Sequence, residues 1–226
     1  MSRGMTEFDH AGWVGRAHSF VMGLARVSSA TVHSAAVAAP VSAVDLATIE
    51  QRLGSALPTS LRDLFVTGAE GIDCRYVFEP NGGSLDELRE ILPDEIRIYG
   101  GARFGPASEL PEFSVAVGEW AEDTWVADEP DQRAIWDAAL PFARLDNGDY
   151  LALDLRTDES NSPVVYLNHD DESAIIAPDL VAFLSAWERL CYLGPEHWLL
   201  LEFTDGRGHL DPDSDRATRL RRLFAG

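Results

Sequence analysis

Apolar residues recur along this chain with two periods, one typical of helices and the other typical of strands. The stretch 42–54 predicts a helix, because leucine and isoleucine repeat on one face between a Ser-Asp capping box and a closing glycine. A second helix is expected to begin at Pro58, which suits a first helical turn, and to end at Gly68. Further helices are expected at 84–92, 120–139, 178–194 and 213–226, and Pro130 must either break or start the second of these.

The strand period is clearest around Asn147-Gly148, a preferred pair for a tight hairpin because both residues tolerate positive φ. The hairpin is predicted to join 142–145 with 150–155. In the second of these strands leucines alternate with other residues, so one face is expected to be buried and the other wet or half-wet. Shorter strands are expected at 74–78, from Ile96 onward and at 163–167.

The chain divides into an N-terminal extension, residues 1–40, and a main domain, residues 41–226, that ends in a helical tail at about 211–226. At 226 residues the chain can bury roughly 70% of the surface that its unfolded form exposes, so one main core is expected. In the extension, Trp13 and Leu24 belong to a loosely helical pattern that small residues follow. This pattern predicts a packed helix and then a linker.

Charge is the strongest compositional feature. The chain has 38 acidic residues against 18 basic ones, all of them arginine, and a net charge of -20. Such a field repels nucleic acid and anionic lipid, because phosphate binding needs clustered cations, and it attracts basic partners over a Debye length of about 8 Å. The composition therefore favours a protein partner over direct binding to nucleic acid or to a membrane. Solubility alone is the other explanation of the acidity.

Cysteine usage and hydropathy predict a cytoplasmic protein. Cys74 and Cys191 lie far apart and fit no ligand or redox spacing, so both are expected to be buried and reduced. No apolar run approaches the ~20 residues that span a bilayer. The stretch 21–40 is rich in Ala, Ser and Val, but Arg26 and His33 interrupt it, unlike the apolar centre of a signal peptide.

Sequence motifs for catalysis are missing. The chain has no lysine for a phosphate loop or a Schiff base, no Gly-x-Ser-x-Gly and no Gly-x-Gly-x-x-Gly. The acidic triplet that begins at Asp211 resembles a calcium loop, yet Arg216 stands where glycine is needed. The histidines show no metal spacing, and His169 beside Asp170 is expected to be a hydrogen-bonded structural residue. We therefore expect no enzyme, no cofactor and no metal site.

Several short motifs stand in a fixed order along the main domain. They are Leu53-Gly54, Leu57-Pro58, Pro141-Phe142, Asn147-Gly148-Asp149-Tyr150, Leu153-Asp154, and Pro163-Val164-Val165-Tyr166 running into His169-Asp170. With these motifs the span 44–190 resembles the SUKH superfamily, the Smi/Knr type of domain found in fungal cell-wall assembly regulators and in bacterial immunity proteins. The sequence departs from that pattern at 67–71, where such proteins often carry an Asn-Gly-Gly stretch.

The resemblance implies an α+β fold, in which a mixed, largely antiparallel sheet has helices packed on it and a concave sheet face binds a protein partner. In bacterial relatives that partner is often a toxin, frequently a nuclease, encoded beside its immunity protein. An acidic inhibitor of a basic nuclease gains fast, steered association. The expected function is therefore a non-enzymatic immunity protein that binds and neutralises a basic toxin encoded nearby. The alternative is a regulatory or scaffold interaction module of the Smi/Knr type with no toxin partner.

Two acidic stretches are the candidate partner-binding surfaces. Turns and strand ends should project the first set to the surface, and the second set combines carboxylates with tryptophans, as anchored interfaces do. The first set is Asp146, Asp158, Glu159, Asp170, Asp171 and Glu172. The second set is Trp120, Glu122, Asp123 and Trp125. Two other interpretations stay open, because turn-forming aspartates also serve as a solvated rim and tryptophans often belong to the core.

Overall fold

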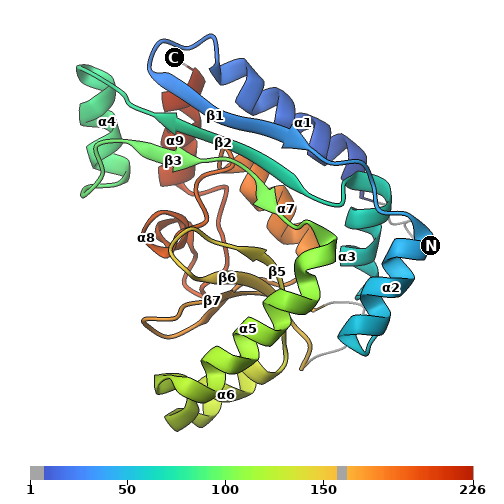
Figure 1. Cartoon of the computed structure of the whole chain (residues 1–226). Coiled ribbons are helices and arrows are strands. Elements are labelled where there is room, and N and C mark those ends of the chain that lie inside the picture. The colour runs from blue at the N-terminus through green and yellow to red at the C-terminus, as the bar shows by residue number, and fades with distance from the viewer. Residues whose placement is uncertain (1–7, 157–161, 226) are drawn as a thin grey trace, which may run out of the picture.

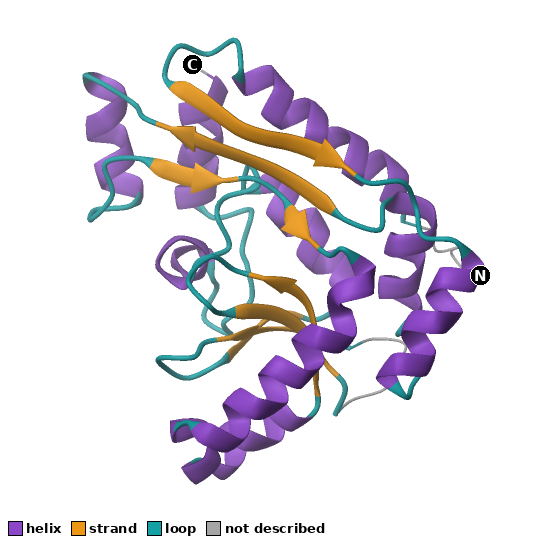
Figure 2. Ribbon diagram, viewed as in Figure 1, coloured by secondary structure: helices purple, strands orange, loops and turns teal. Residues whose placement is uncertain are grey.

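The computed structural model describes residues 8–156 and 162–225, which form two four-stranded antiparallel sheets with helices packed on them (Figures 1 and 2). The first sheet contains β1 (Ala30–Val37), β2 (Ile72–Phe78), β3 (Ile98–Gly100) and β4 (Arg103–Phe104). The second contains β5 (Ala139–Arg144), β6 (Tyr150–Asp154), β7 (Val164–Leu167) and β8 (Ala174–Ala177). The predicted α+β class with largely antiparallel strands is confirmed, with the difference that the described strands form two sheets.

Although no described helix intervenes between β5 and β8, the described helices lie before, between and after the strands. They are α1 (His10–Leu24), α2 (Ala43–Leu53), α3 (Thr59–Asp63), α4 (Gly83–Ile91), α5 (Leu110–Asp123), α6 (Pro130–Asp137), α7 (Leu180–Arg189), α8 (His197–Leu200) and α9 (Asp215–Ala225). Within the described ranges, none of these helices has both the length and the apolar character needed to cross a bilayer.

β2 is the central strand of the first sheet, with β1 on one side and β3 and β4 on the other. Its residues alternate between buried and half-buried positions, so Tyr76 points into the core while Arg75 lies on the opposite face. Phe20 from α1 and Phe224 from α9 contact the ring of Tyr76 edge-on. These two helices therefore cover one face of the sheet, and the face that carries Arg75 stays partly open.

The N-terminal extension contributes directly to this sheet. The helix predicted in it is confirmed as α1, but the predicted linker is wrong, because β1 pairs with β2 along its whole length, Ala30–Val37. The small residues of β1 carry no strand signal of their own, and the pairing is supplied by a distant strand. Trp13 of α1 is fully buried and donates a 2.9 Å hydrogen bond from Nε1 to the carbonyl of Leu184 in α7. The described part of the extension, residues 8–40, thus contributes to the core.

The second sheet has the strand order β5-β6-β7-β8, and the predicted Asn147-Gly148 turn joins β5 to β6. Gly148 has a φ of 100°, which lies in the left-handed region that tight turns use. The wet face predicted for β6 is wrong, because all of its residues are buried. Phe113 of α5 packs edge-on against Tyr150 with ring centroids 5.9 Å apart, so α5 covers a position that alternation alone assigned to solvent.

The helix predicted at 42–54 is confirmed as α2, and its ends are formed by the expected residues. The Ser42 hydroxyl accepts a 3.1 Å hydrogen bond from the backbone N–H of Asp45, and Gly54 ends the helix at a φ of 75°. The second helix begins directly after Pro58 as α3 and continues into a π-helical turn that ends at Gly68.

Two helix predictions are corrected by the structure. One continuous helix across 120–139 is wrong, since α5 ends at Asp123. The expectation that Pro130 breaks or starts a helix there is confirmed, because Pro130 begins a separate helix, α6. The helix expected to continue to residue 194 ends at Arg189, because the backbone takes positive φ soon afterwards, at 50° for Tyr192.

Candidate partner-binding face

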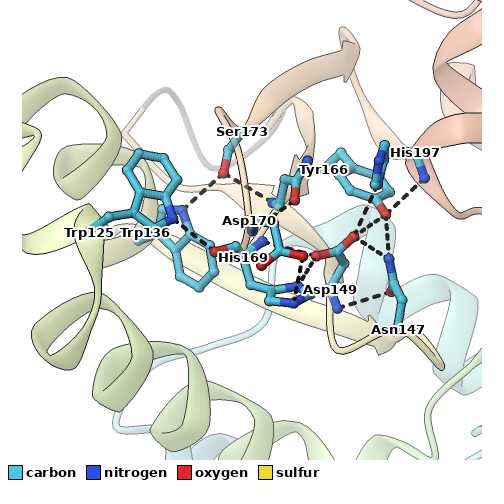
Figure 3. A network of polar contacts seen from close by, with 10 residues as sticks. Trp125, Trp136, Asn147, Asp149, Tyr166, His169, Asp170, Ser173 and His197 are labelled. Atoms are coloured by element: carbon cyan, nitrogen blue, oxygen red, sulfur yellow. Dashed lines mark hydrogen bonds and ion pairs between the residues drawn. The ribbon is translucent and has the colours of Figure 1, made fainter.

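A buried carboxylate organises the surface beside the β5–β6 turn (Figure 3). Asp149 is fully buried, and its Oδ1 accepts a 2.9 Å hydrogen bond from the backbone N–H of His169 and lies 2.6 Å from the ring Nδ1 of the same residue. Its Oδ2 accepts hydrogen bonds from the hydroxyl of Tyr166 and, at 2.5 Å, from the side-chain amide of Asn147. These contacts join the hairpin turn to the end of β7.

Hydrogen bonding keeps Asp149 ionised. Burial alone would raise the pKa of this carboxyl, but the hydrogen bonds from Tyr166, His169 and Asn147 outweigh burial, so the pKa lies below its ordinary value. An ionised carboxylate only accepts, so Nδ1 of His169 carries the hydrogen that it shares with Asp149. The ring Nδ1 of His197 lies 3.7 Å from Oδ2, and the His197 backbone N–H donates a 3.0 Å hydrogen bond to the Tyr166 hydroxyl. The same carboxylate therefore also holds the start of α8.

His169 brings the two predicted acidic stretches together. Its ring Nε2 lies 3.2 Å from Oδ2 of Asp170, and Trp120 of α5 packs edge-on against the ring with centroids 5.3 Å apart. The indole Nε1 of Trp125 donates a 2.8 Å hydrogen bond to the carbonyl of His169 (Figure 3). Residues that lie far apart in the sequence are thus in contact on one surface.

The turn between β7 and β8 is fixed by α6. The hydroxyl of Ser173 accepts hydrogen bonds from the buried indole of Trp136, at 2.9 Å, and from the backbone N–H of Asn168, at 3.2 Å. The side-chain carbonyl of Gln132 accepts a 2.9 Å hydrogen bond from the backbone N–H of Ser173. The side-chain carbonyl of Asn168 accepts a 3.0 Å hydrogen bond from the backbone N–H of Asp170. The acidic side chains of this turn therefore project from a fixed backbone.

We define the acidic face as the exposed side chains that this arrangement presents to solvent. They are Trp120, Glu122, Asp123, Asp170, Asp171 and Glu172. Trp120 remains 39% exposed despite its contact with His169. Within the described residues, none of the five carboxylates forms an ion pair with an arginine. No arginine in the described part of the chain therefore compensates the negative charge of the face.

The other predicted site residues have different places. Trp125 is half-buried and supports the acidic face through its hydrogen bond to His169. Asp146 faces the first sheet, where it forms an ion pair with Arg103 and lies 3.9 Å from Arg75. Asp158 and Glu159 lie outside the described residues.

Sequence reasoning missed the centre of the site, which is Asp149 with Tyr166 and His197. The hairpin motif predicts the turn that carries Asp149, but no local pattern indicates which distant donors surround its carboxylate. The nearest signal was the polar pair His169-Asp170 directly after an apolar strand, and the hydrogen-bonded structural histidine expected there is confirmed.

The chemistry of the site favours a rigid surface. An Asp–His pair can orient a general base, but in the described residues no hydroxyl or thiol hydrogen-bonds the ring of His169, whose outer nitrogen faces Asp170. Burial raises the pKa of Cys74 to about 11 and that of Cys191 to about 12, so both thiols stay protonated at neutral pH and are poor nucleophiles.

The fold and the acidic face define an α+β domain that presents charged side chains on a fixed surface. The sequence model described as the SMI1 / KNR4 family (SUKH-1) matches residues 40–186, more than half of the chain, and the chain belongs to this family. The matched span begins just before α2 and ends within α7, so α1, β1, α8 and α9 lie outside it. The resemblance inferred from the motifs is confirmed. A comparison with curated proteins finds no match.

Proposed function

We propose that this chain is a non-enzymatic, cytoplasmic protein-binding domain that neutralises a basic toxin, with a nuclease as the toxin best matched in charge. The observation that carries the proposal is the acidic face, where five carboxylates that pair with no arginine of residues 8–156 and 162–225 accompany the exposed Trp120. Membership of the SMI1 / KNR4 family supports a binding role. The two free, buried cysteines are compatible with a reducing compartment.

A nuclease would be complementary to the acidic face. Such an enzyme holds phosphates with clustered cations, so its substrate site is positively charged. The net charge of -20 would steer the encounter, and the acidic face would meet the positive site directly. Trp120 supplies the large aromatic anchor that interface hot spots favour, and its ring already packs on His169, which limits the side-chain entropy lost on binding.

Charge reversal on the turn after β7 tests this proposal. The triple variant Asp170→Arg, Asp171→Arg and Glu172→Arg should associate about tenfold more slowly, or worse, with the toxin domain encoded beside this gene. The salt dependence of the association rate should flatten, because the steering charges are gone. Stopped-flow fluorescence over a series of salt concentrations measures both quantities. The variant should fold normally, because the three side chains are exposed.

A matched control changes the net charge equally at another place. The variant Asp86→Arg, Glu87→Arg and Asp94→Arg alters residues in and just after α4, at the other end of the view in Figure 1 from α6. Equal slowing by both variants would remove the acidic face from the interface and leave only general steering. Co-expression with the toxin should restore growth of the host, and binding without restored growth would favour the regulatory module instead.

A further inference from the structure

A cleft that several arginines line lies between the two sheets, and none of the residues of the acidic face lines it. It has a volume of about 340 Å³, and Arg75 of β2, Arg103 of β4 and Arg144 of β5 line it. In a chain with a net charge of -20, three of the 18 basic residues therefore converge on one hollow. We call this hollow the arginine cleft.

Two of the three guanidinium groups are held in place by neighbouring side chains. Arg75 forms a 2.7 Å ion pair with Asp73 and a 3.2 Å hydrogen bond to the hydroxyl of Ser34. Arg103 forms an ion pair with Asp146. Arg144 is exposed, and within the described ranges it forms no ion pair. One cation of the cleft is therefore free to meet a ligand without breaking an existing contact.

Asp146 occupies the position that an external anion would take. Its carboxylate bridges two arginines, because one oxygen accepts from Arg103 and the other lies 3.9 Å from Arg75. The side chain is 64% exposed and stands in the β5–β6 turn, so it can leave the cleft without disturbing the core. The lining side chains carry three positive charges against Asp146 and Glu196, and Asp73 pairs with Arg75 from outside the lining. Departure of Asp146 therefore leaves three positive charges against two carboxylates.

The shape and lining of the cleft indicate a ligand longer than a single ion. Val77, Tyr99 and Pro195 give it an apolar wall, and Tyr99 is 45% exposed. A second hollow of about 450 Å³ shares Arg103 and Arg144 with the first and continues toward α5. The two arginines thus lie where the hollows meet. An extended peptide that ran through both hollows would bring its acidic side chains within reach of these two guanidinium groups.

We propose that the arginine cleft binds an extended acidic peptide segment of a partner protein, with Asp146 as the internal anion that the segment displaces. Carboxylates of the segment would pair with Arg144 and with the fork of donors that Arg103 and Arg75 present, and apolar side chains between them would cover Tyr99. This site does not depend on the proposed toxin partner, because three arginines line it and none of the residues of the acidic face does.

Titration calorimetry with synthetic peptides tests the proposal at low salt. The probe is a blocked hexapeptide of alternating glutamate and valine, and the matched control peptide has glutamine in place of glutamate. The glutamate peptide should bind and the glutamine peptide should not. Arg144→Gln should weaken binding of the glutamate peptide by about tenfold, which is the effect of losing one charge-assisted contact. Asp146→Asn should strengthen binding several-fold, because the peptide then no longer has to displace a carboxylate. Arg89→Gln, in α4 and outside the cleft, should leave the affinity unchanged.

Three results would overturn the proposal. Equal binding of the two peptides would show that the arginines do not recognise carboxylates. Unchanged or weaker binding by Asp146→Asn would show that Asp146 is not displaced. Equal affinity for free glutarate and for the peptide would reduce the cleft to a site for small anions. Because Arg144 and Asp146 are exposed, variants at these positions should fold like the wild type. Circular dichroism of each variant checks this.

Discussion

Replacement of Asp149 by alanine is the most direct test of how the acidic face is held. The variant leaves four donor groups without their acceptor, namely the Tyr166 hydroxyl, the Asn147 amide, and the backbone and ring N–H groups of His169. Each hydrogen bond to a charged group contributes about 1.5–3 kcal/mol, and such contributions are not additive. Removal of one partner from a buried charged network typically costs 3–5 kcal/mol. We therefore expect the free energy of unfolding to fall by about 4 kcal/mol.

The pH dependence of this loss has a defined sign. The folded pKa of Asp149 lies below the unfolded value, so its contribution is fully present above the unfolded pKa of about 3.9 and is lost as pH falls through the folded pKa. The difference in unfolding free energy between the wild type and Asp149→Ala should therefore be constant near neutral pH and should shrink in strong acid. Urea unfolding followed by tryptophan fluorescence at several pH values measures it.

Asp170→Ala is the matched control, because Asp170 is exposed and its only described side-chain contact is with the ring of His169. Its effect should stay within about 0.5 kcal/mol. A loss for Asp149→Ala no larger than for this control, or a difference that grows on acidification, would refute the account of the buried network. Retained stability together with weakened partner binding would show that the network orients the face without supporting the fold.

Two further predictions concern single positions. One oxygen of Glu196 is buried without a hydrogen-bond partner among the described residues, and its pKa is raised, chiefly by burial and then by nearby carboxylates. Because the folded pKa lies above the unfolded one, ionisation of Glu196 costs stability as pH rises from the unfolded pKa through the folded pKa. Glu196→Gln should therefore raise the unfolding free energy at neutral pH more than in acid. A variant that is destabilised at neutral pH would contradict this. A Cβ on Gly101 would lie 1.7 Å from the carbonyl oxygen of Cys74 at a φ of +125°, so Gly101→Ala should lose more than about 3 kcal/mol in urea unfolding. Gly15→Ala, with open space around it in α1, should instead gain about 0.5–1 kcal/mol, and similar effects at both glycines would refute the steric argument.

The β5–β6 turn serves both charged sites. Asp146 faces the arginine cleft, while Asn147 and Asp149 hold His169 under the acidic face. Movement of Asp146 when an acidic segment binds would therefore occur next to the network that positions the acidic face. The reversal of the acidic face and the variant Asp146→Asn address these two sites independently.

Local sequence determined the elements whose signals lie within a few residues. The capping box at Ser42, the closing Gly54, the start at Pro58 and the turn at Asn147-Gly148 all specify backbone geometry by themselves, and the structure confirms each of them. The ordered motifs also identified the family. These features are predictable because caps and turns depend on neighbouring residues and on the conformations that single residues allow.

Only the tertiary structure decided the rest. β1 became a strand because β2 pairs with it, and β6 lost its solvent face because α5 covers it. Asp149 became the centre of the site because donors from Asn147, Tyr166 and His169 converge on it. The net charge of -20 was visible in the composition, but its division into an acidic face and an arginine cleft was not. Pairing, burial and charge compensation depend on residues that are distant in the chain, so the pattern along one segment cannot specify them.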